Sequence, residues 1–144
     1  MENKIANMLA HIKKMKTASE MSLSDLSTRE NLTINELNIV GFLLINPMYN
    51  TAKEIEELRL IKKSNISTSI EQLIKKGYLI RQNDEKDRRI IRLILTEKGT
   101  LLGEEVTKRQ IGLFEQLFNG LSFEEIEIYF SINKKIASNI EKLH

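Results

Sequence analysis

The sequence predicts a mainly α-helical chain that carries one small β-hairpin near its middle. Apolar residues recur at helical spacing along most of the 144 residues, and Thr or Ser followed three residues later by Glu marks several helix starts. Two short β-branched runs around a charged turn indicate the hairpin. With 41 % hydrophobic residues, 29 % charged residues and one proline, the chain has the composition of a folded domain. We expect a single domain over residues 1–144.

The first segment, to about residue 30, is expected to be an amphipathic helix. Its apolar residues Ile5, Leu9 and Ile12 share one face. This stripe is narrow, which is typical of a helix that packs on a partner. Acidic and polar residues interrupt it, so it differs from a signal peptide, and no apolar run in the chain approaches the roughly 18 residues of a membrane span.

Three further helices are expected to begin at capping boxes. The boxes pair Thr33 with Glu36, Thr51 with Glu54, and Ser122 with Glu125. The first of these helices ends before Pro47 because the residue before a proline disfavours helical geometry. The second is short. The third runs to the end of the chain with apolar residues close to a heptad seam.

A helix from about residue 62 to 76 follows a tight turn near residues 60–61. Gly77 takes the position just past its end, where glycine is favoured. The positions expected to be buried are Ile66, Ile70, Leu73 and Ile74. Extended pieces at 78–80 and 90–95 then enclose the polar stretch 83–89, and Thr96 opens a long helix to about residue 118.

The order of elements is that of a winged helix-turn-helix flanked by long helices. We expect the residues from about 33 to about 95 to form the winged lobe. Residues of about 1–30 and 97–144 are expected to form dimerisation helices, because each shows an apolar stripe that a monomer would expose. The residues expected in the interface are Ile5, Leu9, Ile12, Phe130, Ile136 and Ile140.

Basic residues concentrate in the winged lobe. Residues 60–98 contain ten Lys or Arg and five acids, a net charge of +5, whereas the whole chain carries +2 and its remainder therefore −3. A basic region between acidic flanks is expected where one face meets phosphate. The side chains expected to contact DNA are Lys62, Lys63, Ser64, Asn65, Ser67, Thr68 and Gln72 of the helix, and Arg81, Asp87, Arg88 and Arg89 of the hairpin.

The residue types do not favour a disulfide, a metal site, a redox switch or a catalytic site. The chain has no cysteine, which excludes disulfides, thiolate metal sites and a thiol redox switch, and fits a reducing cytoplasm. Its two histidines, His11 and His144, do not supply a zinc site. Neither a nucleophile–base set nor a glycine-rich phosphate loop is present, so we expect no enzyme, no cofactor and no metal.

Several motifs together resemble the MarR family of bacterial regulators. They are Leu32-Thr33, Thr51 to Leu58, Lys63-Ser64-Asn65-Ile66-Ser67, Leu73 with Lys76-Gly77-Tyr78-Leu79, Asp84 to Arg89, and Leu95-Thr96-Glu97-Lys98-Gly99. The wing tip followed by Leu-Thr-Glu-Lys-Gly is the most specific part. Thr68 departs from the family, which often has Arg there, and Lys62 stands where a polar or acidic cap is common.

The resemblance implies a homodimer that binds double-stranded DNA at a pseudo-palindromic operator, acts as a repressor and is released by a small molecule. It also implies that Asp87 and Arg89 form a clamp in the wing. His11 is a candidate for the ligand pocket, although a surface or interface position is the commoner role. The alternative function is a winged-helix module that binds another protein. Such a module would need neither the Arg88 and Arg89 tip nor the basic segment.

Overall fold

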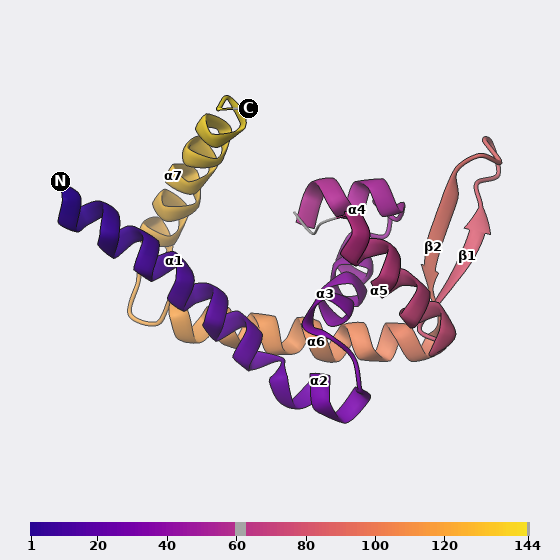
Figure 1. Cartoon of the computed structure of the whole chain (residues 1–144). Helices are drawn as coiled ribbons and strands as arrows, with labels where there is room; N and C mark the ends of the chain where they lie inside the picture. The colour runs from indigo at the N-terminus through magenta and orange to yellow at the C-terminus, as the bar shows by residue number, and fades with distance from the viewer. Residues whose placement is uncertain (60–62, 144) are drawn as a thin grey trace. The chain divides into compact units, whose positions relative to one another are not determined.

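The computed structural model describes residues 1–59 and 63–143. The described elements are α1 (Glu2–Ser22), α2 (Ser24–Glu30), α3 (Ile34–Ile45), α4 (Ala52–Arg59), α5 (Lys63–Lys75), β1 (Leu79–Asn83), β2 (Ile91–Leu95), α6 (Glu97–Leu117) and α7 (Phe123–Glu141) (Figure 1). The predicted tight turn near residues 60–61 lies outside the described residues. The chain divides into two compact units, Met1–Ile111 and Gly112–His144.

All three predicted capping boxes are present. At the start of α3, Glu36 N donates to Thr33 Oγ1 at 3.1 Å and Thr33 N donates to Glu36 Oε2 at 2.8 Å. The same reciprocal pair joins Thr51 to Glu54 before α4, and Ser122 to Glu125 before α7. These bonds satisfy amide groups that a helix N-terminus leaves without intrahelical partners.

The end of α5 is also as predicted. Gly77 has φ of +82°. Its N–H donates to Ile74 O at 3.0 Å, and Tyr78 N donates to Leu73 O at 2.9 Å. This pair of bonds is the Schellman arrangement, which favours glycine because the backbone is left-handed there. Of the four positions expected to be buried, Ile74 is only half-buried, and the other three are buried.

Helix α2 was not predicted. Leu23 separates it from α1 and already bonds to the last turn of α1, through Leu23 N and Glu20 O at 3.2 Å. Asn31 ends α2 in the left-handed region with φ of 52°, which Asn tolerates better than most residues. Leu26 is buried within its seven residues, too few for a helical period to show.

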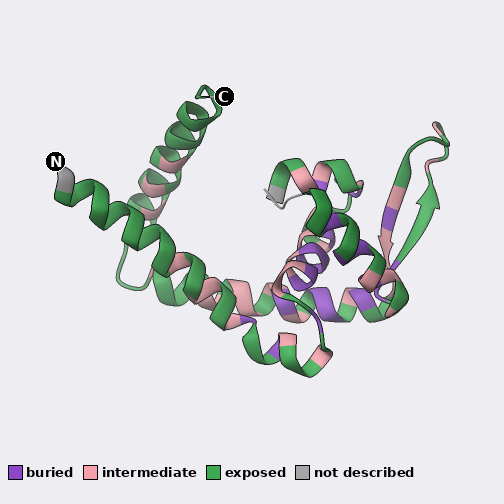
Figure 2. Cartoon of the chain, in the orientation of Figure 1, coloured by how far each residue is buried: buried purple, intermediate pink, exposed green. Residues whose placement is uncertain are grey.

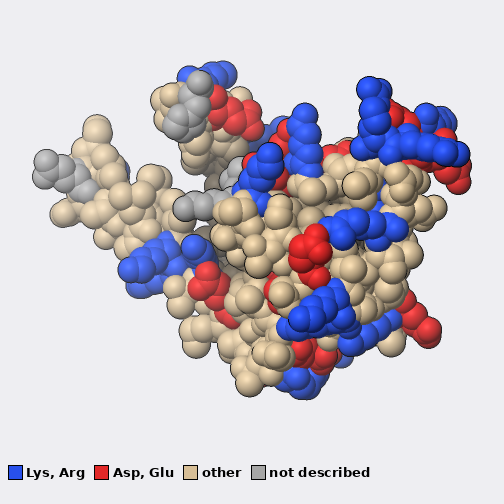
Figure 3. All heavy atoms as spheres, turned by 45° about the vertical axis from the view of Figure 1, so that its right-hand side comes forward, with Lys and Arg blue, Asp and Glu red and all other residues tan. Residues whose placement is uncertain are grey.

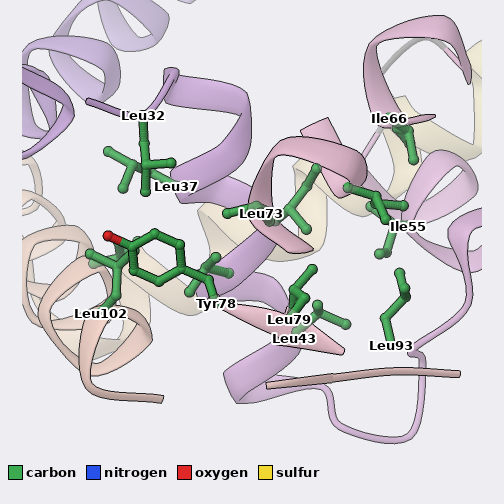
Figure 4. Packing of buried hydrophobic residues seen from close by; sticks show 14 of the residues in the cluster. Leu32, Leu37, Leu43, Ile55, Ile66, Leu73, Tyr78, Leu79, Leu93 and Leu102 are labelled. Atoms are coloured by element: carbon green, nitrogen blue, oxygen red, sulfur yellow. The ribbon is translucent and has the colours of Figure 1, made fainter. Parts of the chain in front are cut away.

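The core lies in the first unit, where α3 packs against α5 and β2 (Figures 2 and 4). A Cβ on Gly41 would lie 2.7 Å from Val106 Cγ1, and one on Gly103 would lie 3.1 Å from Leu44 Cβ. Glycine at these two positions therefore lets α3 and α6 pack closely. Ten of the core side chains are labelled in Figure 4: Leu32, Leu37, Leu43, Ile55, Ile66, Leu73, Tyr78, Leu79, Leu93 and Leu102.

The hairpin pairs β1 and β2 in antiparallel register from Leu79 opposite Leu95 to Asn83 opposite Ile91. Leu79 and Leu93 point into the core with exposures of 1 % and 4 %. Ile80 is half exposed on the other face. Ile91 shares the face of Leu93 but is 48 % exposed, because it pairs with Asn83 at the end of the hairpin farthest from Leu79. The inner face of the hairpin is therefore buried only toward its base.

The long helices outside the core expose their apolar residues. On α1, the exposed fractions of Ile5, Leu9 and Ile12 are 51 %, 58 % and 56 %. On α7, Phe130, Ile136 and Ile140 are 47 %, 46 % and 52 % exposed, and most of this helix is green in Figure 2. No helix among the described residues is both long and apolar enough to cross a membrane.

Within the second unit, aromatic rings join the end of α6 to α7. Phe114 stacks on Phe118 with ring centroids 4.4 Å apart, and Phe118 stacks on Phe130 at 5.7 Å. These rings pack the end of α6 against α7 within the unit.

Candidate nucleic-acid interface

The polar face of α5 is free of the core. Its residues Lys63, Ser64, Asn65, Ser67 and Thr68 are all exposed, and Gln72 is half-buried. The opposite face buries Ile66, Ser69, Ile70 and Leu73. The amphipathic pattern therefore presents short hydroxyl and amide side chains near the helix N-terminus, where such groups suit contacts with base edges and phosphates. Lys62, also predicted here, lies outside the described residues.

Thr68 is partly committed to its own helix. Its Oγ1 donates to Ser64 O, four residues earlier, at 3.1 Å. Threonine makes this backbone contact readily in helices. The hydroxyl oxygen remains able to accept a hydrogen bond, and Thr68 as a whole is exposed, so it offers a base one acceptor and a methyl group.

At the hairpin tip, Asp87 holds Arg89 in a bidentate ion pair. Arg89 Nε donates to Asp87 Oδ1 at 3.0 Å and Nη2 donates to Oδ2 at 3.1 Å. Arg89 N also donates to Oδ1 at 3.0 Å. The Arg89 guanidinium lowers the pKa of the Asp87 carboxyl below its usual range, and the carboxylate raises the pKa of Arg89. The Arg89 side chain nevertheless remains 91 % exposed, so the pair orients a cation that is open to a further ligand.

Asp84 organises the turn that carries this pair. Its Oδ2 accepts from the amides of Lys86 and Asp87, both at 3.0 Å, and Arg92 Nε donates to its Oδ1 at 3.0 Å. The two amides and Arg92 lower the pKa of Asp84, with the Asp87 amide the largest cause. Sequence reasoning assigned Asp84 no role, although an Asp that starts a turn commonly accepts from amides two or three residues on.

Arg81 is paired with the helix. Its Nη2 donates to Glu71 Oε1, which joins β1 to α5. Both side chains are substantially exposed, at 43 % for Arg81 and 62 % for Glu71. Arg81 was predicted as a DNA contact, and its position beside α5 is compatible with that role, but part of its hydrogen-bonding capacity is used within the lobe.

Cationic side chains gather at the hairpin tip. Lys86, Arg88 and Arg89 are all exposed there. Figure 3 shows Lys and Arg atoms intermixed with Asp and Glu atoms at the upper right of the molecule. The mixture matches a tip in which acidic residues orient cations, rather than a uniformly basic surface.

A second polar network ties α2 and α6 to the start of β1. Tyr78 Oη donates to Glu30 Oε2 at 2.9 Å, and burial together with this carboxylate raises the pKa of Tyr78 to about 12. Arg29 bonds both Glu30, at 2.9 Å, and Glu105, at 2.5 Å. Sequence reasoning did not find this network, because its members are separated by up to 76 positions.

The remaining candidates show no comparable constellation. His11 is exposed on α1. Among residues 1–59 and 63–143, no group of three or more His, Cys, Asp or Glu side chains is placed to hold a metal ion.

Comparison with known proteins agrees with this geometry. Residues 30–90 match the model of the MarR family. The chain is 27 % identical over 113 residues to the transcriptional repressor MprA of Escherichia coli (strain K12), a match that covers 76 % of this chain and 64 % of that protein. The chain thus spans under two thirds of the length of this curated relative.

Solved structures match over more of the chain. A MarR protein from Peptoclostridium difficile superimposes with a TM-score of 0.80 at 20 % identity, covering 94 % of this chain and 88 % of the other. A putative MarR family regulator from Listeria monocytogenes, solved with a 26mer DNA, gives 0.79 at 18 % identity, covering 94 % and 87 %. The fold is that of a winged-helix protein flanked by long helices. The residues that match the MarR family model, 30–90, contain α3, α4, α5 and the hairpin tip, so the chain is similar to this family over its winged lobe.

Proposed function

We propose that this protein is a transcriptional regulator that binds duplex DNA through α5 and the hairpin, the wing. The observation that carries the proposal is the exposed Arg89, oriented by Asp87 on a lobe whose α5 presents an exposed polar face. The 26mer DNA in the structure of the Listeria relative supports it. The basic segment, residues 60–98, supplies the charge that phosphate contacts require.

The two parts of the interface are assigned different tasks. The polar residues near the start of α5, led by Asn65, read base edges in the major groove. Arg88 and Arg89 enter the minor groove, whose negative potential attracts arginine. Lys63, Ser64, Ser67, Thr68, Gln72 and Arg81 complete the proposed surface, together with Lys62.

We propose further that the protein acts as a homodimer. The stripe on α1 and the stripe on α7 are exposed, and apolar surface of this kind marks an interaction site. A second copy is the proposed occupant of both, in an isologous two-fold arrangement. Residues 33–95 then form the DNA lobe, while residues 1–30 and 97–144 form the dimer arms. One α5 from each subunit would read half-sites roughly 10 base pairs apart.

The sign of regulation and the signal follow by analogy. The Escherichia coli relative is named a repressor, and we propose repression here. Release by a small molecule is the proposed signal, with His11 of α1 as a candidate contact.

The deciding experiment is a selection of DNA sequences on the purified protein, with salt-dependent retention on heparin measured in parallel. We expect a pseudo-palindromic consensus and retention that falls steeply with salt. A winged-helix module that binds another protein would show no enriched sequence. Footprints confined to a single asymmetric half-site would contradict the dimeric mode of binding.

A further inference from the structure

Asn50 joins the wing to the rest of the lobe. It lies between α3 and α4, directly before the capping residue Thr51, and is only 9 % exposed. Its main-chain O accepts from Leu93 N at 2.8 Å, and its side-chain Oδ1 accepts from Arg92 Nη1 at 3.1 Å. One residue therefore holds two consecutive positions of β2.

Two further side chains, those of Arg92 and Asp84, connect Asn50 to the wing tip. Arg92 uses Nη1 on Asn50 and Nε on Asp84, so a single guanidinium bridges the lobe and the turn. Asp84 in turn accepts from the Lys86 and Asp87 amides. The side chains of Arg92 and Asp84 are 30 % and 20 % exposed, so water competes with these bonds less than at the surface. The series ends at Asp87, the residue that orients Arg89.

A second polar side-chain contact between the hairpin and α5 is weaker. The pair of Arg81 and Glu71 is largely exposed, and exposed ion pairs typically contribute about 0–1 kcal/mol. A buried amide that accepts from a charged donor is harder to replace, because its loss leaves the guanidinium with an unmade hydrogen bond.

We infer that Asn50 is a positioning residue for DNA binding, which sets the placement of the wing relative to α5 through Arg92 and Asp84. The inference rests on the proposed function for its effect on DNA. Asn50 carries no charge and is nearly buried, so it acts on DNA through the wing and not by contact. Its loss should therefore reduce the number of phosphate contacts although no cation is removed.

The test compares Asn50→Ala, Asn50→Asp and the control Asn46→Ala on a mixed-sequence duplex. Asn46 lies in the same connection but donates to Phe42 O of α3. We expect Asn50→Ala to make the plot of log affinity against log salt shallower, by up to about 0.9 for one lost phosphate contact. Asn50→Asp keeps an acceptor for Arg92 and should retain the wild-type slope. Asn46→Ala should retain it as well.

Arg92→Lys gives a second route to the same answer if Asn50→Ala folds poorly. Lysine preserves the charge but is a point donor that does not reproduce the guanidinium fork. This variant should lose the bridge between Asn50 and Asp84 and lower the salt slope. In an Arg89→Ala background, either substitution should have little further effect on the slope, because the contact it positions is already gone.

Amide exchange in the free protein separates the inference from the proposed function. The Lys86 and Asp87 amides should exchange several-fold faster in Asn50→Ala and Arg92→Lys, and at the wild-type rate in Asn50→Asp. Unchanged exchange would overturn the inference, and so would faster exchange with an unchanged salt slope. If the wild type and Arg89→Ala bind with the same slope, the proposed wing contact fails, and exchange alone decides whether Asn50 holds the wing.

Discussion

Gly99 packs directly against the carbonyl oxygen of Tyr78. A Cβ built on Gly99 would lie 2.1 Å from Tyr78 O, closer than any real contact of this kind. The same region is fastened by Thr96, whose N donates to Tyr78 O at 3.1 Å and whose Oγ1 accepts from Gly99 N at 3.1 Å. The first turn of α6 thus packs closely against the backbone that connects α5 to β1, where the wing begins.

Gly99→Ala should destabilise the fold. The neighbouring atoms are backbone, which moves less readily than a side chain, so we expect a loss of at least about 1–3 kcal/mol of unfolding free energy. Urea denaturation followed by circular dichroism measures it. Gly112→Ala is the matched control, because it lies on the same helix with no atom within 4 Å of the added Cβ. It should be neutral or stabilising by roughly 0.5–1 kcal/mol, and equal losses in both variants would contradict the close contact.

Arg89→Ala should weaken binding to every duplex and make the salt slope shallower by about 0.9, since one phosphate contact is lost. Asp87→Ala should have a milder effect, because it frees the guanidinium without removing its charge. Salt titrations with cognate and scrambled duplexes measure both variants. Lys108→Ala, an exposed cation on α6, serves as the control for the loss of one charge. If Arg89→Ala has the same affinity and salt slope as Lys108→Ala, the wing does not contact DNA, and the result favours the alternative function of binding another protein.

Asn65→Ala should relax discrimination between cognate and scrambled duplexes while leaving the salt slope unchanged. A good base contact provides about 1–3 kcal/mol of discrimination. Thr68→Ala should fall at the low end of that range, because the hydroxyl proton is already donated to Ser64 O. Competition binding with single base-pair changes in the selected operator measures the effect. A uniform loss on all sequences would assign Asn65 to phosphate instead.

Local interactions account for what the sequence predicted well. A capping box involves two residues three apart, so the start of α3 at Thr33 and of α7 at Ser122 could be located without knowledge of the fold. The end of α5 at Gly77 follows from backbone geometry that glycine tolerates. The pair of Asp87 and Arg89 is equally local, and it was inferred from the family resemblance.

Contacts distant in sequence account for what was missed. The bond from Arg92 to Asn50 spans 42 positions, and no local pattern marks Asn50 as an acceptor. The short helix α2 has a buried Leu26 and a left-handed Asn31, but its length conceals any helical period. Ile74 was expected in the core because it follows the apolar spacing, yet it lies at the edge of the stripe and is half-buried.

Ile136→Glu should shift the protein from dimer to monomer. Ile136 is 46 % exposed in the single chain and is proposed to become buried against a second copy, where an unpaired carboxylate would be costly. Analytical ultracentrifugation across a concentration series measures the shift. Ser138→Glu, an exposed position on the opposite face of α7, is the control and should leave the dimer intact. A wild-type protein that sediments as a soluble monomer at micromolar concentration would contradict the proposed interface.

Stability should fall at alkaline pH because of Tyr78. The folded state raises the pKa of this phenol from 10.0 to about 12, so the unfolded chain loses its proton first as the pH rises. The stabilisation is fully present below pH 10 and is lost between about 10 and 12. Two pKa units correspond to at most about 2–3 kcal/mol.

Tyr78→Phe isolates this contribution. Below pH 10 the variant should be less stable by about 0.5–1.5 kcal/mol, because the hydrogen bond to Glu30 is gone while Glu30 keeps Arg29 as a partner. As the pH rises toward 12, the unfolding free energy of the wild type falls, because its folded state keeps the phenol protonated while the unfolded chain releases the proton. Tyr78→Phe has no phenol to titrate, so the difference in unfolding free energy between the two proteins should shrink and then reverse. Urea denaturation of both proteins at a series of pH values measures the difference. A difference that stays constant to pH 12 would show that the folded state does not hold the Tyr78 proton.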